Sequence, residues 1–401
     1  ARPSGGRKVA GSSPASPTRF LKTALALCGG AVFSWVKVKG GFAMATDRTR
    51  GVLPDHRIET MIAEGQITLT APPAETQVQP ASLDLRLGPV AYRVRASFLA
   101  GKDARVADRL AEFEMHKIDI SAGAVLEKGC VYVVPLMEGL NLPQDISAVA
   151  NAKSSTGRLD LLTRTITDSG TEFDRIAHGY NGPLYAEICP RSFSVLVRAG
   201  ARLNQIRFRQ GQAVLSDDEL RARHAESPLV SGETAVIDEG LGFSVDLKRE
   251  NSTLVGYRAK PHTGVIDLDR IGAYDARDFW EEIHTDQGRI ILDPGAFYIL
   301  VSREEVSIPP DCAAEMSPYL AMVGEFRVHY AGFFDPGFGH GQPARGVLEV
   351  RCHEAPFVLE HGQVVGRLVY ERMESLPSTL YGREIASNYQ GQGLKLSKHF
   401  K

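Results

Sequence analysis

The feature that most constrains this chain is a pattern that returns at a fixed distance along it. Leu184–Ile188 (LYAEI) is echoed by Arg345–Val350 (RGVLEV), and Gly200–Phe208 (GARLNQIRF) is echoed by Gly362–Tyr370 (GQVVGRLVY). In both cases the offset is 162 positions, which places Glu349 opposite Glu187. Repeated returns to one offset are the signature of an internal repeat.

Two further matches extend the pattern. Ser82–Arg86 (SLDLR) resembles Ser244–Lys248 (SVDLK), again at 162 positions. Lys128–Ile146 resembles Pro294–Cys312 with the offset drifting to 166, as small insertions in duplicated loops would produce. The chain is therefore predicted to be a tandem duplication of one unit.

Each unit reads mainly as strand. Short runs of β-branched, aromatic and leucine residues are separated by Gly, Pro and Asp at intervals of about 8–12 residues, which is typical of a β-sandwich or barrel. Helical patterns are few and are expected at 56–64, 105–114, 217–225 and 274–283. We predict two mainly-β domains, 44–229 and 230–401, that divide within the charged stretch 216–239.

Bulk composition narrows the possible partners. A formal net charge of −2 over 401 residues gives no electrostatic reason to expect nucleic acid or a membrane surface as a partner. The five cysteines are scattered with no CxxC spacing, so neither a disulfide framework nor a structural zinc site is indicated. We expect a reducing, cytoplasmic setting.

Residues 1–43 are treated apart from the domains. Phe20–Val38 is apolar but contains Lys22 and a Gly-Gly pair, and it is too short for a typical membrane-spanning helix. A signal peptide is one interpretation, because basic residues precede an apolar core. The alternative, which we favour, is that Met44 is the natural start and that the preceding residues form a non-core extension.

One short segment carries the chemistry of anion binding. Lys153–Arg158 (KSSTGR) places two adjacent hydroxyls and a glycine between a lysine and an arginine. Hydroxyl and amide donors can position phosphate oxygens, while the cations neutralise them. Taken alone, such a segment is more often a polar turn with solvated charges.

Four motifs that occur in a fixed order along the chain favour anion binding over a solvated polar turn. They are QPASLDLRLG at 79–88, the SSxxR cluster at 154–158, a glutamate near the end of an apolar strand at Glu187, and NYQGQGLKLSKHF at 388–400. From about residue 57 to the C-terminus the chain thereby resembles the dCTP deaminases of the dUTPase-like superfamily. The resemblance implies distorted, jelly-roll-like β-barrels, homo-oligomers with trimer-type packing, and active sites between units.

The same resemblance implies a reaction and its ligands. The expected reaction is hydrolysis of dCTP to dUTP and ammonia, with dTTP as an inhibitor and Mg²⁺ bound through the triphosphate rather than by protein side chains. Zinc-dependent deamination instead requires H-x-E followed by P-C-x-x-C. The sequence contains no P-C-x-x-C, so zinc is not expected. One carboxylate that alternates between base and acid can perform the proton transfers.

Residue roles follow from the resemblance. Glu187 is the expected general acid/base, and Ser154 orients the water with help from Arg158. The other expected nucleotide contacts are Lys153, Ser155, Thr156, Gly157, Asp174, Tyr185, Tyr381, Asn388, Tyr389 and Gln392. Asp174 lies in EFDRI, which departs from the DPG of the family, and Asn388 stands where many members have lysine.

The second copy differs in an informative way. It keeps a DPG turn in Phe334–Phe338 (FDPGF) and a glutamate at Glu349, but the stretch opposite SSTGR is Ser317–Gly324 (SPYLAMVG). Met322 stands where an arginine is expected, so a complete second site is not predicted. The first copy would supply the SSxxR cluster, and the second would supply a closing tail at 378–401.

Three questions stay open from sequence alone. Either Glu187 or Glu349 could complete the site of Ser154 and Arg158. The enzyme could also hydrolyse dUTP onward to dUMP, as a bifunctional deaminase and diphosphatase. A protein of another class, a nucleotide-binding regulator without turnover, would bind dCTP or dTTP and release no ammonia.

Overall fold

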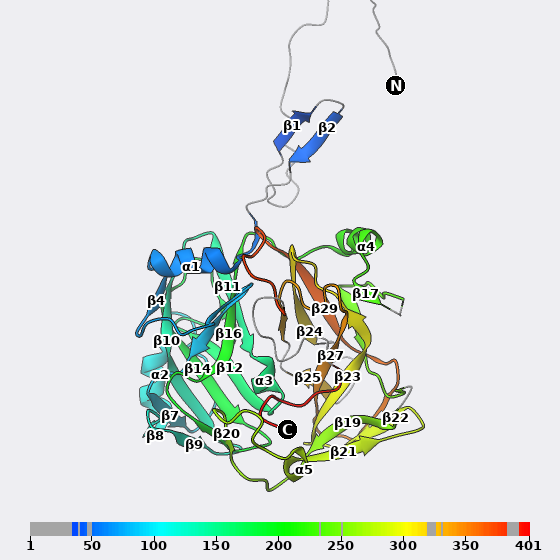
Figure 1. Cartoon of the computed structure of the whole chain (residues 1–401). Helices are drawn as coiled ribbons and strands as arrows, with labels where there is room; N and C mark the ends of the chain where they lie inside the picture. The colour runs from blue at the N-terminus through cyan, green and yellow to red at the C-terminus, as the bar shows by residue number, and fades with distance from the viewer. Residues whose placement is uncertain are drawn as a thin grey trace, which may run out of the picture. The chain divides into compact units, whose positions relative to one another are not determined.

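The computed structural model describes the backbone of 34–38 and 41–45 and the residues 50–231, 234–249, 252–318, 326–329, 332–382 and 393–401, except the side chains of 318, 326, 327 and 329. The chain divides into two compact units, Ala1–Asp47 and Arg48–Lys401. In the first unit, β1 (Ser34–Val38) and β2 (Gly41–Ala45) pair antiparallel. The second unit contains both predicted halves (Figure 1).

The first half is built from two six-stranded sheets. One has the order β12–β14–β10–β7–β8 with β4 on β10, and the other β13–β11–β16–β6–β5 with β3 on β16. The first comprises β4 Ile67–Leu69, β7 Val90–Val94, β8 Glu114–Asp119, β10 Val131–Asn141, β12 Leu161–Thr167 and β14 Asn181–Pro190. The second comprises β3 Gly51–Val52, β5 Val78–Gln79, β6 Ser82–Arg86, β11 Ile146–Ala152, β13 Arg175–Ile176 and β16 Arg202–Gln210.

The described strands of the second half follow a similar plan, in sheets of six, four and two strands. Its sheets have the orders β21–β19–β23–β27–β25 with β17 on β23, β18–β29–β24–β26, and β22–β28. The strands are β17 Val230–Ser231, β18 Leu241–Ser244, β19 Leu254–Ala259, β21 Trp280–His284, β22 Arg289–Leu292, β23 Phe297–Val306, β24 Cys312–Pro318, β25 Phe326–His329, β26 Phe333–Phe334, β27 Ala344–Cys352, β28 Phe357–Glu360 and β29 Val364–Arg372. The mainly-β fold predicted from the sequence is confirmed.

Strand register reproduces the offsets seen in the sequence. Val133 pairs with Glu187 between β10 and β14, and Ile299 pairs with Glu349 between β23 and β27. These partners are related by 166 and 162 positions. One of the sequence matches is wrong, however. The strand β6 pairs with β16, and β18 pairs with β29 in the same register, which makes Ser82–Arg86 the counterpart of Gly240–Ser244. The predicted partner Ser244–Lys248 lies four residues too far on.

The described helices are short. They are α1 Asp55–Ala63, α2 Val106–Phe113, α3 Ser154–Gly157, α4 Asp217–Glu226 and α5 Ala276–Phe279. Three lie where the sequence pattern predicted helix, but the prediction for 274–283 is largely wrong. Only α5 is helical there, because Trp280 begins a strand that pairs with β19 and packs its ring against Phe193 at 5.3 Å.

The two halves are joined by a buried arginine. Arg207 on β16 is fully buried, and its guanidinium donates to Glu371 Oε2 at 3.2 Å and to Asp335 Oδ1 at 3.1 Å, both in the second half. It also donates to the carbonyl oxygens of Ala81 and Ala314. A buried charge of this kind is tolerated only when its donors are satisfied, so Arg207 ties the halves to one relative arrangement.

A second connection runs through the end of the chain. The short strand β20 (Ile266–Asp267) of the second half pairs in parallel with β15 (Val195–Val197) of the first, whose other edge pairs with β9 (Ala124–Leu126). Residues 393–401 then return to this region, and the Phe400 ring lies 5.4 Å from that of Phe279 and 5.9 Å from that of Trp280. The last residues are therefore anchored in an aromatic cluster.

This anchor gives a first expected result. Phe400→Ala removes the whole aromatic ring of a residue that is 8% exposed, and we expect the free energy of unfolding to fall by about 3 kcal/mol. Leu376→Ala is the control, since Leu376 is 61% exposed. Urea titration of both variants checks the prediction, and an equal effect in the two would contradict it.

Candidate active site

The predicted phosphate cluster folds as one helical turn between two strands. Lys153 ends the extended stretch after β11, and its carbonyl accepts the amides of Thr156 at 2.8 Å and Gly157 at 2.9 Å, which closes α3. Ser155 and Thr156 are buried, whereas Ser154 is half-buried. The segment is therefore not a solvated turn. It holds its backbone amides and the hydroxyls of its serine and threonine side chains in fixed positions.

The arginine of the cluster points into the second half. Arg158 is 3% exposed, and its Nε lies 3.8 Å from Oε1 of Glu349. Its Nη1 donates to the carbonyl oxygen of Lys395 at 3.1 Å. Of the two candidate carboxylates, Glu349 is thus the one that forms an ion pair with the SSxxR cluster.

Glu349 sits in an environment that holds its proton. It lies on β27 and is 4% exposed. Burial raises the pKa of the Glu349 carboxyl to about 8, although the positive charge of Arg158 acts in the opposite direction. A carboxyl group with a pKa near neutrality can both accept and release a proton under ordinary conditions.

Glu187 has a different partner. It lies on β14 directly opposite Arg164 of β12, whose Nε and Nη2 both contact Glu187 Oε1, at 3.1 and 2.5 Å. Arg164 is further fixed by the ring of Phe173, 3.5 Å from its guanidinium carbon, and by Ser97. Glu187 is therefore held in a tight ion pair within its own half.

Asp174 and Tyr185 lie with Glu187 in the first half and have partners there. Asp174 accepts the amide of Thr165 at 2.7 Å, and burial raises its pKa to about 7. Tyr185 packs in an apolar cluster of its own half with Val94, Phe98, Ala100, Val106, Leu110, Val133 and Ile166. The structure thus brings together two groups of predicted residues rather than one.

The second half contributes an aspartate that the sequence analysis did not assign. Asp335, in the DPG turn after β26, accepts a hydrogen bond from Arg207 and is 8% exposed. Burial raises the pKa of this carboxyl, and the positive charges of Arg207 and Lys153 oppose the rise. The DPG motif itself was the available signal, because it is intact in this half.

The tail approaches the same region from both of its ends. The Tyr381 amide donates to Pro336 of the DPG turn at 3.0 Å, and its ring lies 5.6 Å from that of Phe338. Downstream, Ser397 donates to the carbonyl oxygen of Ser155 at 2.8 Å. Asn388, Tyr389 and Gln392 lie outside the described residues.

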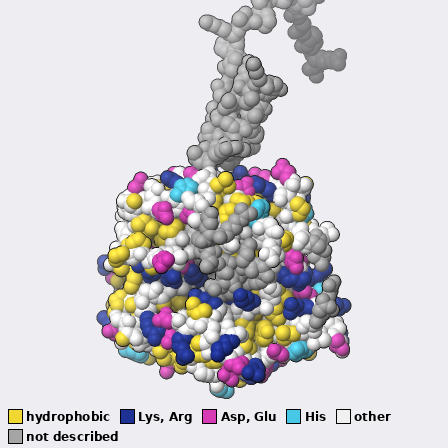
Figure 2. Space-filling view, in the orientation of Figure 1, with side chains coloured by type: hydrophobic (Ala, Val, Ile, Leu, Met, Phe, Trp, Pro, Cys, Tyr) yellow, Lys and Arg dark blue, Asp and Glu magenta, His cyan; other side chains and the backbone are white. Residues whose placement is uncertain are grey.

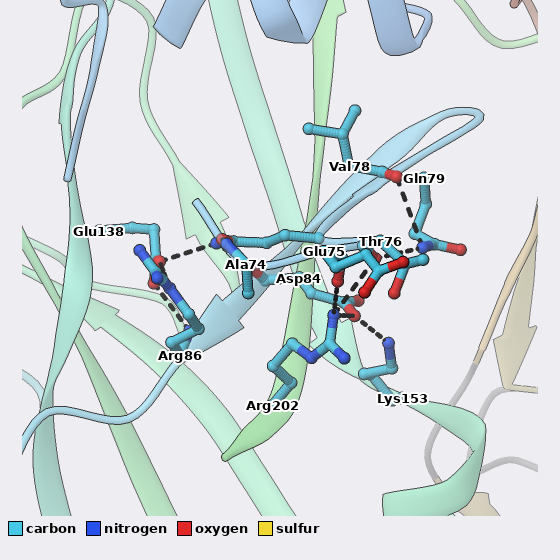
Figure 3. Close-up of polar contacts among 11 residues, drawn as sticks. Ala74, Glu75, Thr76, Val78, Gln79, Asp84, Arg86, Glu138, Lys153 and Arg202 are labelled. Carbon is cyan, nitrogen blue, oxygen red and sulfur yellow. Dashed lines mark hydrogen bonds and ion pairs between the residues drawn. The ribbon is translucent and has the colours of Figure 1, made fainter. Parts of the chain in front are cut away.

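Lys153 is held beside a buried aspartate. Its ammonium contacts Asp84 of β6, and Arg202 of β16 approaches the same carboxylate at 3.5 Å (Figure 3). Nearby, Glu138 accepts from Arg86 Nε at 2.7 Å and from Gln77 at 2.8 Å. These ion pairs and the hydrogen bond from Gln77 hold β6, which carries most of the QPASLDLRLG motif, next to Lys153 of the phosphate cluster.

Two family models match consecutive parts of the chain that correspond to its two halves. The N-terminal domain model of 2'-deoxycytidine 5'-triphosphate deaminase (DCD) covers residues 49–212, and the C-terminal domain model covers 216–400. The chain belongs to the dCTP deaminase family. A solved structure of the 2'-deoxycytidine 5'-triphosphate deaminase from Agrobacterium tumefaciens is 55% identical with a TM-score of 0.79, covering 82% of this chain and 100% of that one.

Curated members of the family match about half of the chain. The dCTP deaminase of Halorubrum lacusprofundi is 31% identical over 188 residues, which is 45% of this chain and 87% of that protein. The dUMP-forming dCTP deaminase of Methanothermobacter thermautotrophicus is 30% identical over 188 residues, 45% of this chain and 90% of that protein. Each of these relatives is therefore about as long as one half.

Two features of the described residues bear on metal binding and membrane insertion. Across those residues, no three His, Cys, Asp or Glu side chains are grouped so that they could hold a metal ion. The helices in that part of the chain include none long and apolar enough to cross a membrane.

Proposed function

We propose that this dCTP deaminase converts dCTP and water to dUTP and ammonia at the junction of its two halves. Lys153, Ser154, Ser155 and Arg158 of the first half would form one wall, and Glu349 would form the other. The observation that carries this proposal is the buried contact between Arg158 and Glu349, which joins the phosphate cluster to a carboxyl group of raised pKa.

The proton transfers can be assigned to one carboxylate. Glu349 accepts a proton from water as the water oxygen bonds to C4 of the cytosine, and it delivers that proton to N3. It then transfers a proton from the new hydroxyl to the exocyclic nitrogen, so that the C4–N4 bond breaks and ammonia leaves. Ser154 and Arg158 would orient the water, and each transfer returns Glu349 to the carboxylate form.

The remaining expectations concern binding and assembly. Lys153, Ser155, Thr156 and Gly157 would contact the triphosphate, with Mg²⁺ carried by the nucleotide and Asp335 near the sugar. In this proposal Glu187, Asp174 and Tyr185 take no part in the reaction: Arg164 pairs with the carboxylate of Glu187, Asp174 accepts the amide of Thr165, and Tyr185 packs in an apolar cluster of the first half. We further infer that the chain is a duplication with one active site per copy of the chain; dTTP inhibition, homo-oligomers and a cytoplasmic setting stay predictions.

The proposed base gives a pH dependence. Because the carboxylate form must accept the proton of water, kcat/KM for dCTP should rise about tenfold per pH unit below pH ~8 and level off above it. Initial rates of ammonia release between about pH 5 and 10 would measure this limb. A midpoint at the ordinary carboxyl value of 4.5 would contradict the assignment of the raised pKa to the working group.

Product analysis tests the function itself. The enzyme is incubated with dCTP and Mg²⁺, and nucleotides, ammonia and pyrophosphate are quantified. We expect one ammonia per dUTP formed and no pyrophosphate. Release of pyrophosphate with dUMP would show the bifunctional reaction, whereas dCTP binding without ammonia would overturn the proposal in favour of a regulator.

A further inference from the structure

A second ion pair crosses the junction two residues beyond the contact between Arg158 and Glu349. Arg351 lies on β27 two positions after Glu349, and Asp160 follows Arg158 by two positions, between α3 and β12. The Arg351 guanidinium contacts the Asp160 carboxylate. The first half thus supplies a cation and then an anion, and the second half meets them with an anion and then a cation.

The two charged side chains of β27 point toward the first half together. Alternate residues of a strand lie on the same side of a sheet, so Glu349 and Arg351 share a face, while Val350 between them is buried in the apolar core of the second half. Residues two apart on a strand are separated by roughly 7 Å. The position of Arg351 is therefore linked to that of Glu349 through a single short stretch of backbone.

Each member of the Asp160–Arg351 pair is also fixed within its own half. Ser192 Oγ donates to Asp160 Oδ2 at 2.7 Å, and the Asp160 amide donates to the carbonyl oxygen of Gly157 at 2.8 Å. Asp160 has a φ of 52°, in the left-handed region where Asp and Asn are enriched. Arg351 Nη1 donates to the carbonyl oxygen of Gly295 at 2.6 Å. The ion pair therefore connects two fixed points rather than two flexible side chains.

Burial separates these four charges from the ordinary surface charges of the protein. Charged side chains of both signs are spread over the face shown in Figure 2, where water solvates them. The four side chains at the junction, by contrast, are at most 11% exposed. A buried charge is tolerated only when an opposite charge compensates it, so the alternating signs allow two cations and two anions to be buried side by side.

The internal repeat shows that this arginine belongs to one copy of the unit. At an offset of 162 positions, Glu349 corresponds to Glu187 and Arg351 corresponds to Cys189. Glu187 pairs with Arg164 of its own half. An arginine two positions after the glutamate therefore occurs in the copy whose glutamate meets the SSxxR cluster, and cysteine replaces it in the other copy.

We propose that Asp160 and Arg351 are positioning residues that hold the Glu349 carboxyl opposite Arg158, an inference that rests on the proposed function of Glu349. They act through β27 and the turn after α3, and they transfer no proton. A displacement of about 1 Å at a reacting group can cost about a hundredfold in rate, so a contact that sets the position of the base should govern kcat. The proposed triphosphate contacts belong to the first half, so KM should depend on this pair much less.

Arg351→Met is the main test, because it removes the cation of the pair and leaves the sequence of the phosphate cluster intact. We expect kcat for ammonia release from dCTP to fall about ten- to a hundredfold, with KM within about threefold of the unmodified enzyme. Asp160→Asn, which suits the same backbone conformation, is a second variant should Arg351→Met fold poorly, and its kcat should also fall. The double variant should be little worse than Arg351→Met, because both changes break one contact.

Arg345→Met is the matched control. Arg345 lies on the same strand, but it contacts Asp246 within its own half. Urea titration should show a loss of stability in both arginine variants, whereas Arg345→Met should keep kcat within about twofold of the unmodified enzyme. Unchanged kcat in folded Arg351→Met and Asp160→Asn, or an equal loss of kcat in Arg345→Met, would overturn the proposal.

A measurement without catalysis separates this inference from the proposed function. If the unmodified enzyme releases no ammonia from dCTP, the proposed function fails, and the positioning of Glu349 is judged from unfolding instead. The effects of Arg351→Met and Glu349→Gln on the unfolding equilibrium constant should then deviate from additivity by at least about threefold, since one residue positions the other. Additive effects in that experiment would count against the positioning pair itself.

Discussion

Glu349→Gln is expected to abolish the deamination of dCTP, with a loss in kcat of about 10²–10⁴. The amide keeps the size of the side chain but cannot accept the proton of water. Since the carboxyl group is buried and opposite Arg158, the change removes a charge without opening a cavity. Rates of ammonia release at saturating dCTP, together with dCTP affinity from calorimetry, separate this chemical loss from a loss of binding.

Glu187→Gln is the matched comparison. Glu187 is equally buried and occupies the equivalent strand position, yet it is paired with Arg164. We expect kcat within about threefold of the unmodified enzyme, and a free energy of unfolding lower by about 1–3 kcal/mol because a charged hydrogen bond is weakened. If Glu187→Gln abolished turnover and Glu349→Gln did not, the assignment of the site to the junction would be wrong.

Arg207→Met is expected to have the largest effect on stability. The methionine fills part of the volume, but it leaves the carboxylates of Asp335 and Glu371 buried without their shared guanidinium. Breaking a buried ion pair from one side is strongly destabilising, and we expect a loss of about 4 kcal/mol or more. Arg209 still contacts Glu371 at 2.5 Å, so Asp335 bears most of the change.

Two measurements separate stability from function in this variant. Urea denaturation should show the loss relative to Arg221→Met, a control on α4 where Arg221 is 53% exposed and pairs with the exposed Asp218. Among the molecules that remain folded, KM for dCTP should rise because the DPG turn loses its anchor. A stability change below about 1 kcal/mol would show that Arg207 does not hold the halves together.

Local sequence patterns predicted helices and strands better than they predicted which residues contact one another. Helices α1, α2 and α4 have clear amphipathic or capping signals, and Ser216 forms a capping box with Glu219. The helix expected at 274–283 forms only over Ala276–Phe279 and gives way to a strand at Trp280, because long-range packing of Trp280 outweighs local propensity. α3 was not predicted, since four residues of polar and small side chains carry no periodicity.

In the candidate site, too, residue types could be identified from the sequence but their long-range contacts could not. The SSxxR cluster could be identified by residue type, but its carboxylate could not. Arg158 and Glu349 are 191 positions apart, so no local rule relates them. Arg164 and Glu187 face one another only because of the register between β12 and β14, which the intervening loop determines. The first pair depends on how the two halves pack and the second on strand register within one half, and repeats in a sequence reveal neither.

The covalent joining of the halves has a consequence for how the site responds to dilution. In a protein whose two walls came from separate chains, the occupied fraction of complete sites would fall as the protein was diluted. Here Arg158 and Glu349 share one chain, so their encounter is intramolecular and has a fixed effective concentration. Specific activity should therefore be independent of enzyme concentration, because the proposed catalytic pair is assembled once, when the chain folds.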